Sequence, residues 1–291
     1  MIVPGRIISE QDVARHYDEL DRFYLDVWGE HLHHGLWVSG NESAETAVRQ
    51  LVDLVAVEAG IKAEARVCDV GAGYGAAARH IAVDYGANVT ALTLSPAQHE
   101  YARRHAPTGG NLEYILGDWL QNELPSEEFD AVYAIECASH MADPQRFVSE
   151  AARVLRPGGR LVVCAWVAAE QTSPRNVRHL LEPICREGRL THLSTAREYV
   201  ELLEEAGLDL SNFEDLSRRV RKTWPICLTR TIRRSFWKPQ YLRYLTSREA
   251  TNRIFLITML RIWLAYRAGV IRYILFRATK PSHHGGQTVE A

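Results

Sequence analysis

The residues with the clearest chemical signature form the run DVGAGYG at residues 69–75. Its glycines stand at every second position, where the missing Cβ lets the backbone bend sharply and lets a ligand approach the main chain. A turn of this kind between a strand and a helix seats a nucleotide-like ligand at the helix N-terminus. The run therefore predicts a cofactor site, with a purely structural turn as the alternative. The spacing of the glycines alone does not distinguish a site for a nicotinamide dinucleotide from a site for another cofactor.

His140 is the leading candidate for a general base. It follows an expected strand at 129–135, in the run Glu136-Cys137-Ala138-Ser139-His140. Open parallel sheets bind ligands at the carboxyl ends of their strands, and an imidazole changes its charge near neutral pH. The alternative is that His140 only packs or forms a hydrogen bond near the pocket.

Three histidines, His31, His33 and His34, stand close together in the run HLHHG. Adjacent histidines rarely point at one ion, and no carboxylate or cysteine pattern completes a site, so we expect no metal. We expect this segment to lie over the cofactor, with aromatic residues that shield it from water. Those aromatic residues are Tyr17, Trp28 and Trp37, for which core packing is the alternative.

Alternating strands and helices surround the glycine run. The apolar patterns predict strands at 66–70, 88–94, 112–116, 129–135 and 160–166, and helices at 76–85, 96–105 and 144–155. Such repetition is typical of an α/β fold with a mostly parallel, doubly wound sheet and helices on both faces.

The flanking segments predict five parts in all. We expect an N-terminal helical lid over 1–60, a Rossmann-like core over 61–223, a helical cap over 224–269, a final core strand over 270–280 and a disordered tail over 281–291. Within the core we expect a helix at 195–206 and a strand around 216–223. The aromatic residues of the cap would line a hydrophobic pocket.

Composition narrows the classes of partner. The net charge is −2, and the sequence has no basic stripe, so a nucleic-acid partner is not expected. The five cysteines form no CxxC pair, and the N-terminus lacks a secretory signal, which favours a cytoplasmic protein. The apolar stretch 254–276 is interrupted by three arginines and is not expected to span a membrane, although weak contact of this cap with a membrane surface stays open. The oligomeric state is left open.

Four motifs in order resemble the class I S-adenosylmethionine-dependent methyltransferases. They are VCDVGAGYG, the pair Gly117-Asp118, FDAVYAIE and RVLRPGGRLVV, within residues 65–166. Three further runs, WGEHLHHGLW, VTALTLSPAQ and AYRAGVIRYILFRATKP, resemble the gamma-tocopherol methyltransferase group and bacterial natural-product methyltransferases. The resemblance implies a seven-stranded sheet whose antiparallel last strand lies beside the fifth.

The resemblance also implies a site for S-adenosylmethionine. Its residues would be Asp69, Gly71, Ala72, Gly73 and Gly75 at the methionine moiety, Thr93, Leu94 and Gln98 at the ribose, Gly117, Asp118 and Trp119 at the adenine, and Glu136 at the pocket floor. One departure is that the acidic residue that ends the second strand in many members is absent here, where Thr93 stands in the run TLSP. The missing acid and the lack of a Tyr-x-x-x-Lys pair also count against a dehydrogenase.

The expected activity is methyl transfer to a lipophilic small molecule of secondary metabolism, that is, natural-product biosynthesis. Transfer to oxygen is favoured because a histidine suits removal of a hydroxyl proton. The alternatives are transfer to carbon or nitrogen of an aromatic, terpenoid or alkaloid acceptor, and, more remotely, a non-catalytic binding protein. The residues expected to contact the acceptor are Tyr17, Trp28, His33, His34, Trp237, Tyr241 and Trp263.

Overall fold

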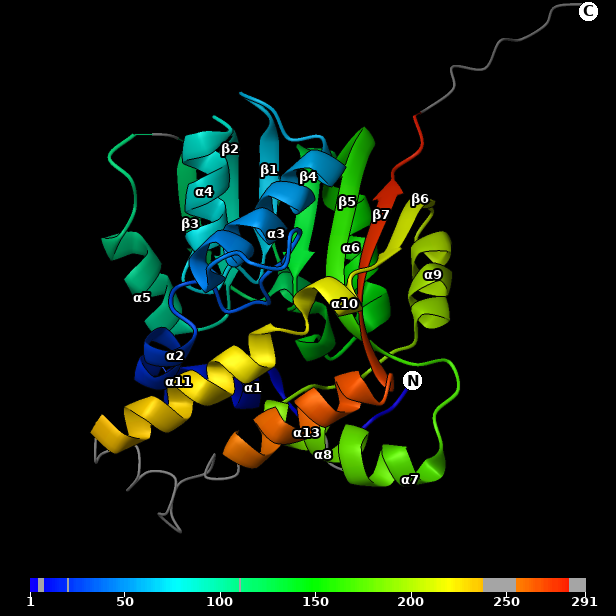
Figure 1. Ribbon diagram of the computed structural model, residues 1–291. Coiled ribbons are helices and arrows are strands. Elements are labelled where there is room, and N and C mark those ends of the chain that lie inside the picture. The colour runs from blue at the N-terminus through cyan, green and yellow to red at the C-terminus, as the bar shows by residue number, and fades with distance from the viewer. Residues whose placement is uncertain (5–7, 20, 110, 238–254, 283–291) are drawn as a thin grey trace, which may run out of the picture.

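A single sheet of seven strands organises the chain (Figure 1). The computed structural model describes residues 1–4, 8–19, 21–109, 111–237 and 255–282. The strands lie in the order β3-β2-β1-β4-β5-β7-β6. They are β1 (Arg66–Val70), β2 (Asn88–Thr93), β3 (Leu112–Leu116), β4 (Phe129–Ile135), β5 (Leu155–Ala168), β6 (Asp209–Asp215) and β7 (Ile271–Thr279).

The direction of the last strand confirms the predicted topology. Strands β1 to β5 pair in parallel, whereas β7 runs antiparallel to both β5 and β6. The β5–β7 ladder is continuous from the pair Arg160–Thr279 to the pair Ala168–Ile271. The sheet is therefore the seven-stranded, doubly wound α/β sheet expected from the sequence.

The predicted strand at 216–223 is wrong. The sixth strand instead ends at Asp215, and the short helix α10 (Ser217–Val220) follows it. Leu216, Val220 and Trp224 are buried at a spacing of four residues, which is a helical repeat. The true strand was missed because β6 is a polar edge strand whose residues alternate only between exposed and half-buried.

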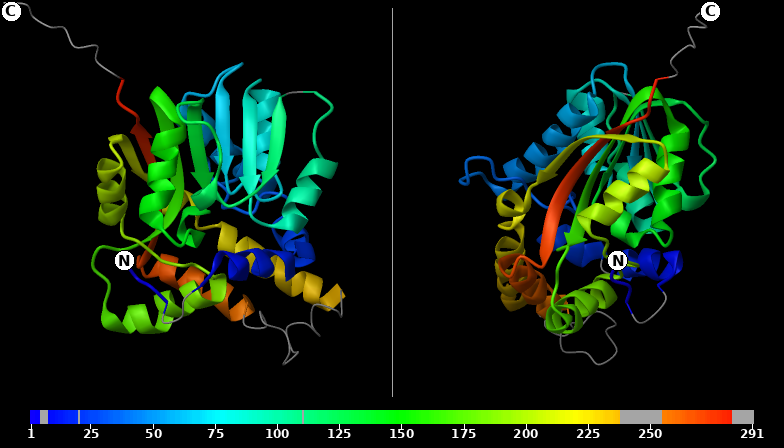
Figure 2. Two further views of the ribbon diagram at one scale, coloured as in Figure 1. Left: turned by 180° about the vertical axis from the view of Figure 1, so that it is seen from behind. Right: turned by 90° about the vertical axis from the view of Figure 1, so that its right-hand side faces the viewer.

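Helices cover both faces of the sheet (Figure 2). The first face is covered by α3 (Ala44–Ala59) and α4 (Ala76–Asp84), and α5 (Pro96–Arg104) packs on β2 and β3. The other face is covered by α6 (Pro144–Val154) and α9 (Ala196–Glu205). Fully buried residues such as Leu51 and Phe147 anchor the two layers, and each contributes about 1.5–3 kcal/mol through burial.

Local signals explain where these helices begin. Helix α5 starts after Ser95, whose hydroxyl caps the backbone N–H of Gln98, and α6 starts after Asp143, which caps Arg146. Proline is the first residue of each helix, where its missing N–H has no cost. Helix α9 begins with a capping box between Thr195 and Glu198. Its observed bounds agree with the predicted helix.

The remaining helices gather beyond the carboxyl ends of the parallel strands (Figures 1 and 2). They are α1 (Glu10–Glu19), α2 (Asp21–Val27), α7 (Pro174–Asn176), the π-helical turn η3 (Val177–Leu181), α8 (Glu182–Gly188), α11 (Thr223–Trp237) and α13 (Phe255–Arg267). Two 3-10 turns, η1 (Trp119–Gln121) and η2 (Ala138–His140), follow β3 and β4.

The helices of the expected N-terminal lid lie in two different places. Helices α1 and α2 lie at this end of the molecule, whereas α3 packs on the sheet against α4, β4 and β5. The division into lid, core and cap stays a prediction. Most of the expected tail and the middle of the expected cap lie outside the described residues. Within the described ranges, no helix is both long enough and apolar enough to cross a bilayer.

Candidate functional site

The glycine-rich turn borders a cavity at the carboxyl ends of β1, β2 and β4, here called the glycine cavity. Gly71, Gly73 and Gly75 all have positive φ angles, between 56° and 73°. A Cβ on Gly71 would lie 2.4 Å from the Cβ of Cys137, and one on Gly75 would lie 2.5 Å from the ring of Tyr114. All three glycines are therefore favoured by their backbone angles, and Gly71 and Gly75 are also required by the close approach of neighbouring side chains.

The glycine cavity brings together nearly all the residues predicted to bind the cofactor. Those that line it are Asp69, Gly71, Ala72, Gly73, Thr93, Leu94, Gln98, Gly117, Asp118, Trp119 and Glu136. Gly75 is not among them, because it lies at the end of the turn, as the N-cap residue of α4. His33 and Tyr17, expected near the acceptor, also line this cavity.

Asp69 has the feature that best tests whether a cofactor fits. The residue is 2% exposed, and its Oδ2 atom has no hydrogen-bond partner among the described residues. Burial raises the pKa of Asp69 to about 7, against a weaker opposing effect of the Tyr133 hydroxyl. Space is open beside Gly73, where an added Cβ would meet no atom within 4 Å. Asp69 and Gly73 line the same cavity, and a buried acceptor atom in its wall fits the cationic amino group of a methionine moiety.

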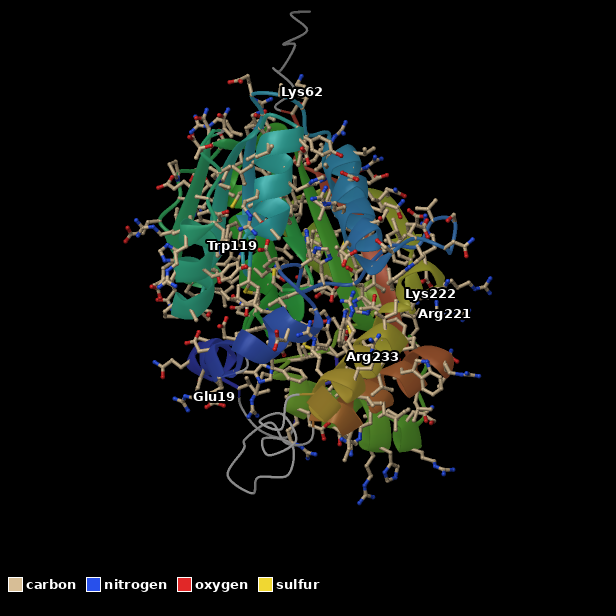
Figure 3. The ribbon with its side chains drawn as sticks, turned by 60° about the vertical axis from the view of Figure 1, so that its left-hand side comes forward. Glu19, Lys62, Trp119, Arg221, Lys222 and Arg233 are labelled. Carbon is tan, nitrogen blue, oxygen red and sulfur yellow. The ribbon has the colours of Figure 1, made fainter. Side chains whose placement is uncertain are left out.

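Hydrogen bonds hold the far wall of the glycine cavity in place. The Thr93 hydroxyl donates to Gln98 Oε1 at 2.9 Å, and the Asp118 carboxylate accepts from the backbone N–H of Leu120 at 2.9 Å. The buried Trp119, visible at the sheet in Figure 3, donates from its indole to the Phe147 carbonyl at 3.0 Å. The residues predicted at the ribose and adenine are thus positioned before any ligand binds.

Three acidic residues of the N-terminal segment bond to the core around this cavity. Asp18 accepts a hydrogen bond from Ser95 at 2.5 Å, and Asp21 accepts one from the Tyr74 hydroxyl at 2.6 Å. Glu30 accepts from the Tyr101 hydroxyl at 2.7 Å. These contacts hold α1 and α2 over the cavity. The sequence had not indicated them, because the partners lie 53 to 77 residues apart.

A second cavity, here called the aromatic cavity, lies beside the first. It is lined by Tyr17, Tyr24, Trp28, Leu32, His34, Glu136, Ser139, His140, Trp166, Ile184, Gly188, Leu190, Trp224, Thr258 and Ile262. Tyr17, Leu32, Glu136 and His140 line both cavities and so mark where they meet. No lysine or arginine is among the described lining residues.

Glu136 stands at the centre of a buried hydrogen-bond network. Its carboxylate accepts from the backbone N–H of His34 at 2.6 Å, the His34 ring at 2.9 Å, the Trp166 indole at 3.1 Å and the Tyr273 hydroxyl at 2.9 Å. The Trp224 indole donates to His34 Nε2 at 2.8 Å. An indole N–H only donates, so Nε2 of His34 accepts this bond and the ring presents its Nδ1–H to Glu136.

This network stabilises the negative charge of the Glu136 carboxylate in a buried environment. Burial alone would raise the pKa of Glu136, but its contacts with His34 outweigh that effect and hold the pKa below its usual value. Glu136 also has φ of 61°, which is unusual for a residue with a side chain and is commonly retained at functional sites. The structure therefore presents a carboxylate anion at the junction of the two cavities.

His140 reaches the same junction with a defined proton position. Its Nδ1 lies 2.9 Å from the Arg189 carbonyl oxygen, which can only accept, so Nδ1 carries the proton. Its Nε2 lies 3.1 Å from the Tyr17 hydroxyl and accepts that hydrogen bond. Burial lowers the pKa of His140 and raises that of Tyr17, which Glu136 raises further. His140 is thus a neutral imidazole whose lone pair points to Tyr17.

The other two histidines of the HLHHG run form a neutral chain. His33 Nδ1 donates to the His34 carbonyl at 2.8 Å, and His33 Nε2 lies 3.0 Å from His31 Nδ1. Burial and then the neighbouring His33 lower the pKa of His31 to about 2. In the part of the chain that the structure describes, no group of three or more His, Cys, Asp or Glu side chains is arranged to hold a metal ion.

The predicted acceptor residues fall in different places. Tyr17, Trp28 and His34 line the aromatic cavity. Trp263 lines neither cavity and instead lies under the Arg267 guanidinium, 5.0 Å from it. Trp237 is the last residue of α11, and Tyr241 lies outside the described residues.

Several residues of the aromatic cavity were missed from the sequence, and one expected shield lies elsewhere. Tyr24 and Trp166 line the cavity from two separate elements, and only their aromatic character could have indicated them. Trp224, one of the aromatic residues of the expected cap, lines it as well. Trp37 does not shield the site, because its indole donates to the Glu42 carbonyl away from both cavities.

Comparison with known proteins adds an independent finding. Residues 68–163 match a family described as a methyltransferase domain. The chain is 29% identical over 289 residues to a probable tocopherol O-methyltransferase of Oryza sativa subsp. japonica, covering 94% of this chain and 78% of that one. It is 30% identical over 220 residues to the 27-O-demethylrifamycin SV methyltransferase of Amycolatopsis mediterranei, with 74% and 80% covered. The solved structure of the [4+2]-cyclase SpnF is 26% identical, with a TM-score of 0.76 and 96% and 98% covered.

Proposed function

Because the chain belongs to the class I S-adenosylmethionine-dependent methyltransferases, we propose that it methylates a hydroxyl oxygen of a lipophilic small molecule of natural-product type. The cofactor of this family supplies a methyl group that is already electrophilic when bound. What the chain must provide is alignment of donor and acceptor, exclusion of water, and removal of the acceptor proton. The two adjoining cavities offer a place for each reactant.

The observation that carries this proposal is His140 at the junction of the cavities. Its Nδ1–H is held by the Arg189 carbonyl, so Nε2 is the nitrogen that can accept a proton. The Tyr17 hydroxyl now donates to that lone pair, so an acceptor hydroxyl either displaces Tyr17 or passes its proton through it. Because the pKa of Tyr17 is raised, Tyr17 stays protonated and acts as a donor. The names of the two curated relatives also favour transfer to oxygen.

A second candidate is transfer to nitrogen or carbon, and Glu136 favours it. A buried carboxylate stabilises positive charge in an aromatic cavity whose described lining has no lysine or arginine. An amine, or an aromatic or olefinic carbon, gains positive charge when it is methylated. A phenol, in contrast, would lose its proton close to an anion.

Matched acceptors distinguish these activities. We expect a lipophilic phenol to yield a methyl ether and S-adenosylhomocysteine, and its O-methylated analogue to yield neither, as measured by mass spectrometry with isotope-labelled cofactor. If only the matching aniline is turned over, the methylated atom is nitrogen. If the phenol is methylated on its ring, the methylated atom is carbon. Either result would contradict transfer to oxygen. Cofactor binding without S-adenosylhomocysteine formed from any of them would point to a non-methylating role, such as the cyclase name of one structural relative implies.

Asp69 predicts a pH dependence of cofactor binding. With a pKa of about 7, Asp69 is increasingly protonated below neutral pH and then no longer attracts the amino group of the cofactor. We therefore expect the Kd for S-adenosylmethionine, measured by calorimetry, to rise toward about tenfold per pH unit below pH 7. Above about pH 8 the ligand amino group itself loses its proton, so affinity falls again.

The variant Asp69→Asn tests the role of this carboxylate in both pH changes. It removes the acid-side change in Kd, because the asparagine amide does not titrate, and it flattens the alkaline change, because the ligand amino group then has no carboxylate partner to lose. The variant also binds more weakly at pH 7.5. If the Kd of Asp69→Asn still rises below pH 7 as it does in the wild type, another group controls the pH dependence.

A further inference from the structure

Positive charge is concentrated on one group of helices of this weakly acidic chain. The helices α7, η3 and α8 (174–188), α11 (223–237) and α13 (255–267), here called the basic helical face, contain eight arginines and two glutamates. Neither α11 nor α13 contains an acidic residue. These segments therefore carry a formal charge of +6 in a chain whose net charge is −2.

Much of this charge faces solvent. Arg175, Arg178, Arg186, Arg233 and Arg267 are exposed. One of the two glutamates, Glu187, is neutralised by Arg261 and accepts a hydrogen bond from Thr258. Figure 3 shows Arg233 at the helical end of the molecule, away from the acidic Glu19 on α1 and far from Lys62 at the opposite end.

The same face exposes an apolar row. Ile257, Leu260 and Leu264 on α13 are 51%, 43% and 42% exposed, and Ile232 on α11 is 43% exposed. The three α13 residues are spaced by three and four positions and so lie along one side of the helix. Arginines flank them at 261 and 267. Apolar side chains between arginines are typical of helices that lie in the interface of an anionic bilayer.

The basic helical face also forms part of the wall of the aromatic cavity. Ile184 and Gly188 come from α8, Trp224 from α11, and Thr258 and Ile262 from α13. The inner side of these helices faces the cavity proposed for a lipophilic acceptor, and the outer side carries the arginines and the apolar row.

We propose that this face docks on an anionic membrane surface, so that a lipophilic acceptor reaches the cavity from lipid. The reason for docking rests on the proposed function, but the docking itself can be measured separately.

A membrane fits this surface better than a nucleic acid. A nucleic acid would use the arginines but leave the apolar row without a partner. A bilayer uses both, because the apolar side chains enter the acyl boundary while the arginines contact the headgroups.

Vesicle co-sedimentation tests the proposal on the full chain without cofactor or acceptor. We expect binding to phosphatidylcholine vesicles that contain phosphatidylglycerol, much weaker binding to pure phosphatidylcholine, and loss of binding at high salt. At about fivefold per basic residue, Arg175→Ala, Arg178→Ala and Arg233→Ala together weaken binding about 100-fold. Leu260→Ser with Leu264→Ser weakens it about tenfold through lost apolar contact.

The matched pair is Arg233→Ala and Lys62→Ala. Each removes one exposed positive charge, at opposite ends of the molecule (Figure 3). We expect about fivefold weaker binding for the first and no change for the second. Absence of vesicle binding, equal effects of the two variants, or tight binding of a single-stranded RNA without vesicle binding would overturn the proposal. Calorimetric binding of S-adenosylmethionine by every variant shows that it is folded, and it keeps failure of docking distinct from failure of the methyl-transfer proposal.

Discussion

We expect His140→Ala to lower kcat by about 10²–10⁴-fold while the Kd for S-adenosylmethionine changes by less than about twofold. The change removes the Nε2 lone pair at the junction of the cavities, but most of the cofactor-binding wall belongs to other elements. Single-turnover kinetics with a hydroxylated acceptor and calorimetric titration of the cofactor measure the two effects. A kcat within about threefold of the wild type would contradict the role of His140 as base.

The control for this experiment is His140→Asn. An asparagine amide can still donate to the Arg189 carbonyl, as Nδ1 does, but it cannot accept a proton at neutral pH. We expect this variant to be as inactive as His140→Ala, whereas recovery of activity would indicate a structural role. Burial lowers the pKa of His140. As the pH is lowered, the wild-type kcat should therefore stay constant past the ordinary pKa of histidine and fall only in more acid solution.

The second large effect is expected from Glu136→Gln, which should lower the free energy of unfolding by about 3 kcal/mol or more. The carboxylate accepts from His34, Trp166 and Tyr273, and all of these partners are donors. A glutamine brings its own amide N–H groups toward those donors and leaves buried hydrogen bonds unmade. Urea denaturation followed by tryptophan fluorescence measures the loss.

Glu113→Gln provides the matched control. Glu113 is an exposed residue of β3, so the same change there should alter stability by less than about 0.5 kcal/mol. A loss below about 1 kcal/mol for Glu136→Gln would mean that water or a rearranged His34 replaces the missing bonds. Comparison of phenol and aniline turnover in the same variant also tests whether the negative charge of Glu136 selects the acceptor.

The sequence predicted those parts of the fold that depend on neighbouring residues. Each buried parallel strand is a short apolar run, and capping residues such as Ser95 and Asp143 mark the helix starts. Most residues predicted at the cofactor also lie around one cavity, because they follow strand ends in motifs of a few residues. The edge strand β6 was missed because no layer buries either of its faces completely.

The acceptor side depends on contacts between distant segments, and there the prediction was incomplete. His34 and Glu136 are 102 residues apart, and Trp224 is 190 residues from His34. Helix α13 is apolar around most of its circumference, so its sequence does not tell which side faces inward. Met259, Ile262 and Tyr266 are buried, whereas the more conspicuous Trp263 lies outside the cavity. No local pattern would have favoured the first set.

The bond between Trp224 and His34 has a consequence for attempts to change the acceptor by recombination with a relative. It joins the N-terminal segment to α11, while Glu136 joins His34 of that segment to Trp166 and Tyr273 of the sheet. A chimera that receives a foreign cap alone would separate an indole from the imidazole that it orients. Residues 1–37 and 223–267 should therefore be exchanged together, as one module encoded in two pieces.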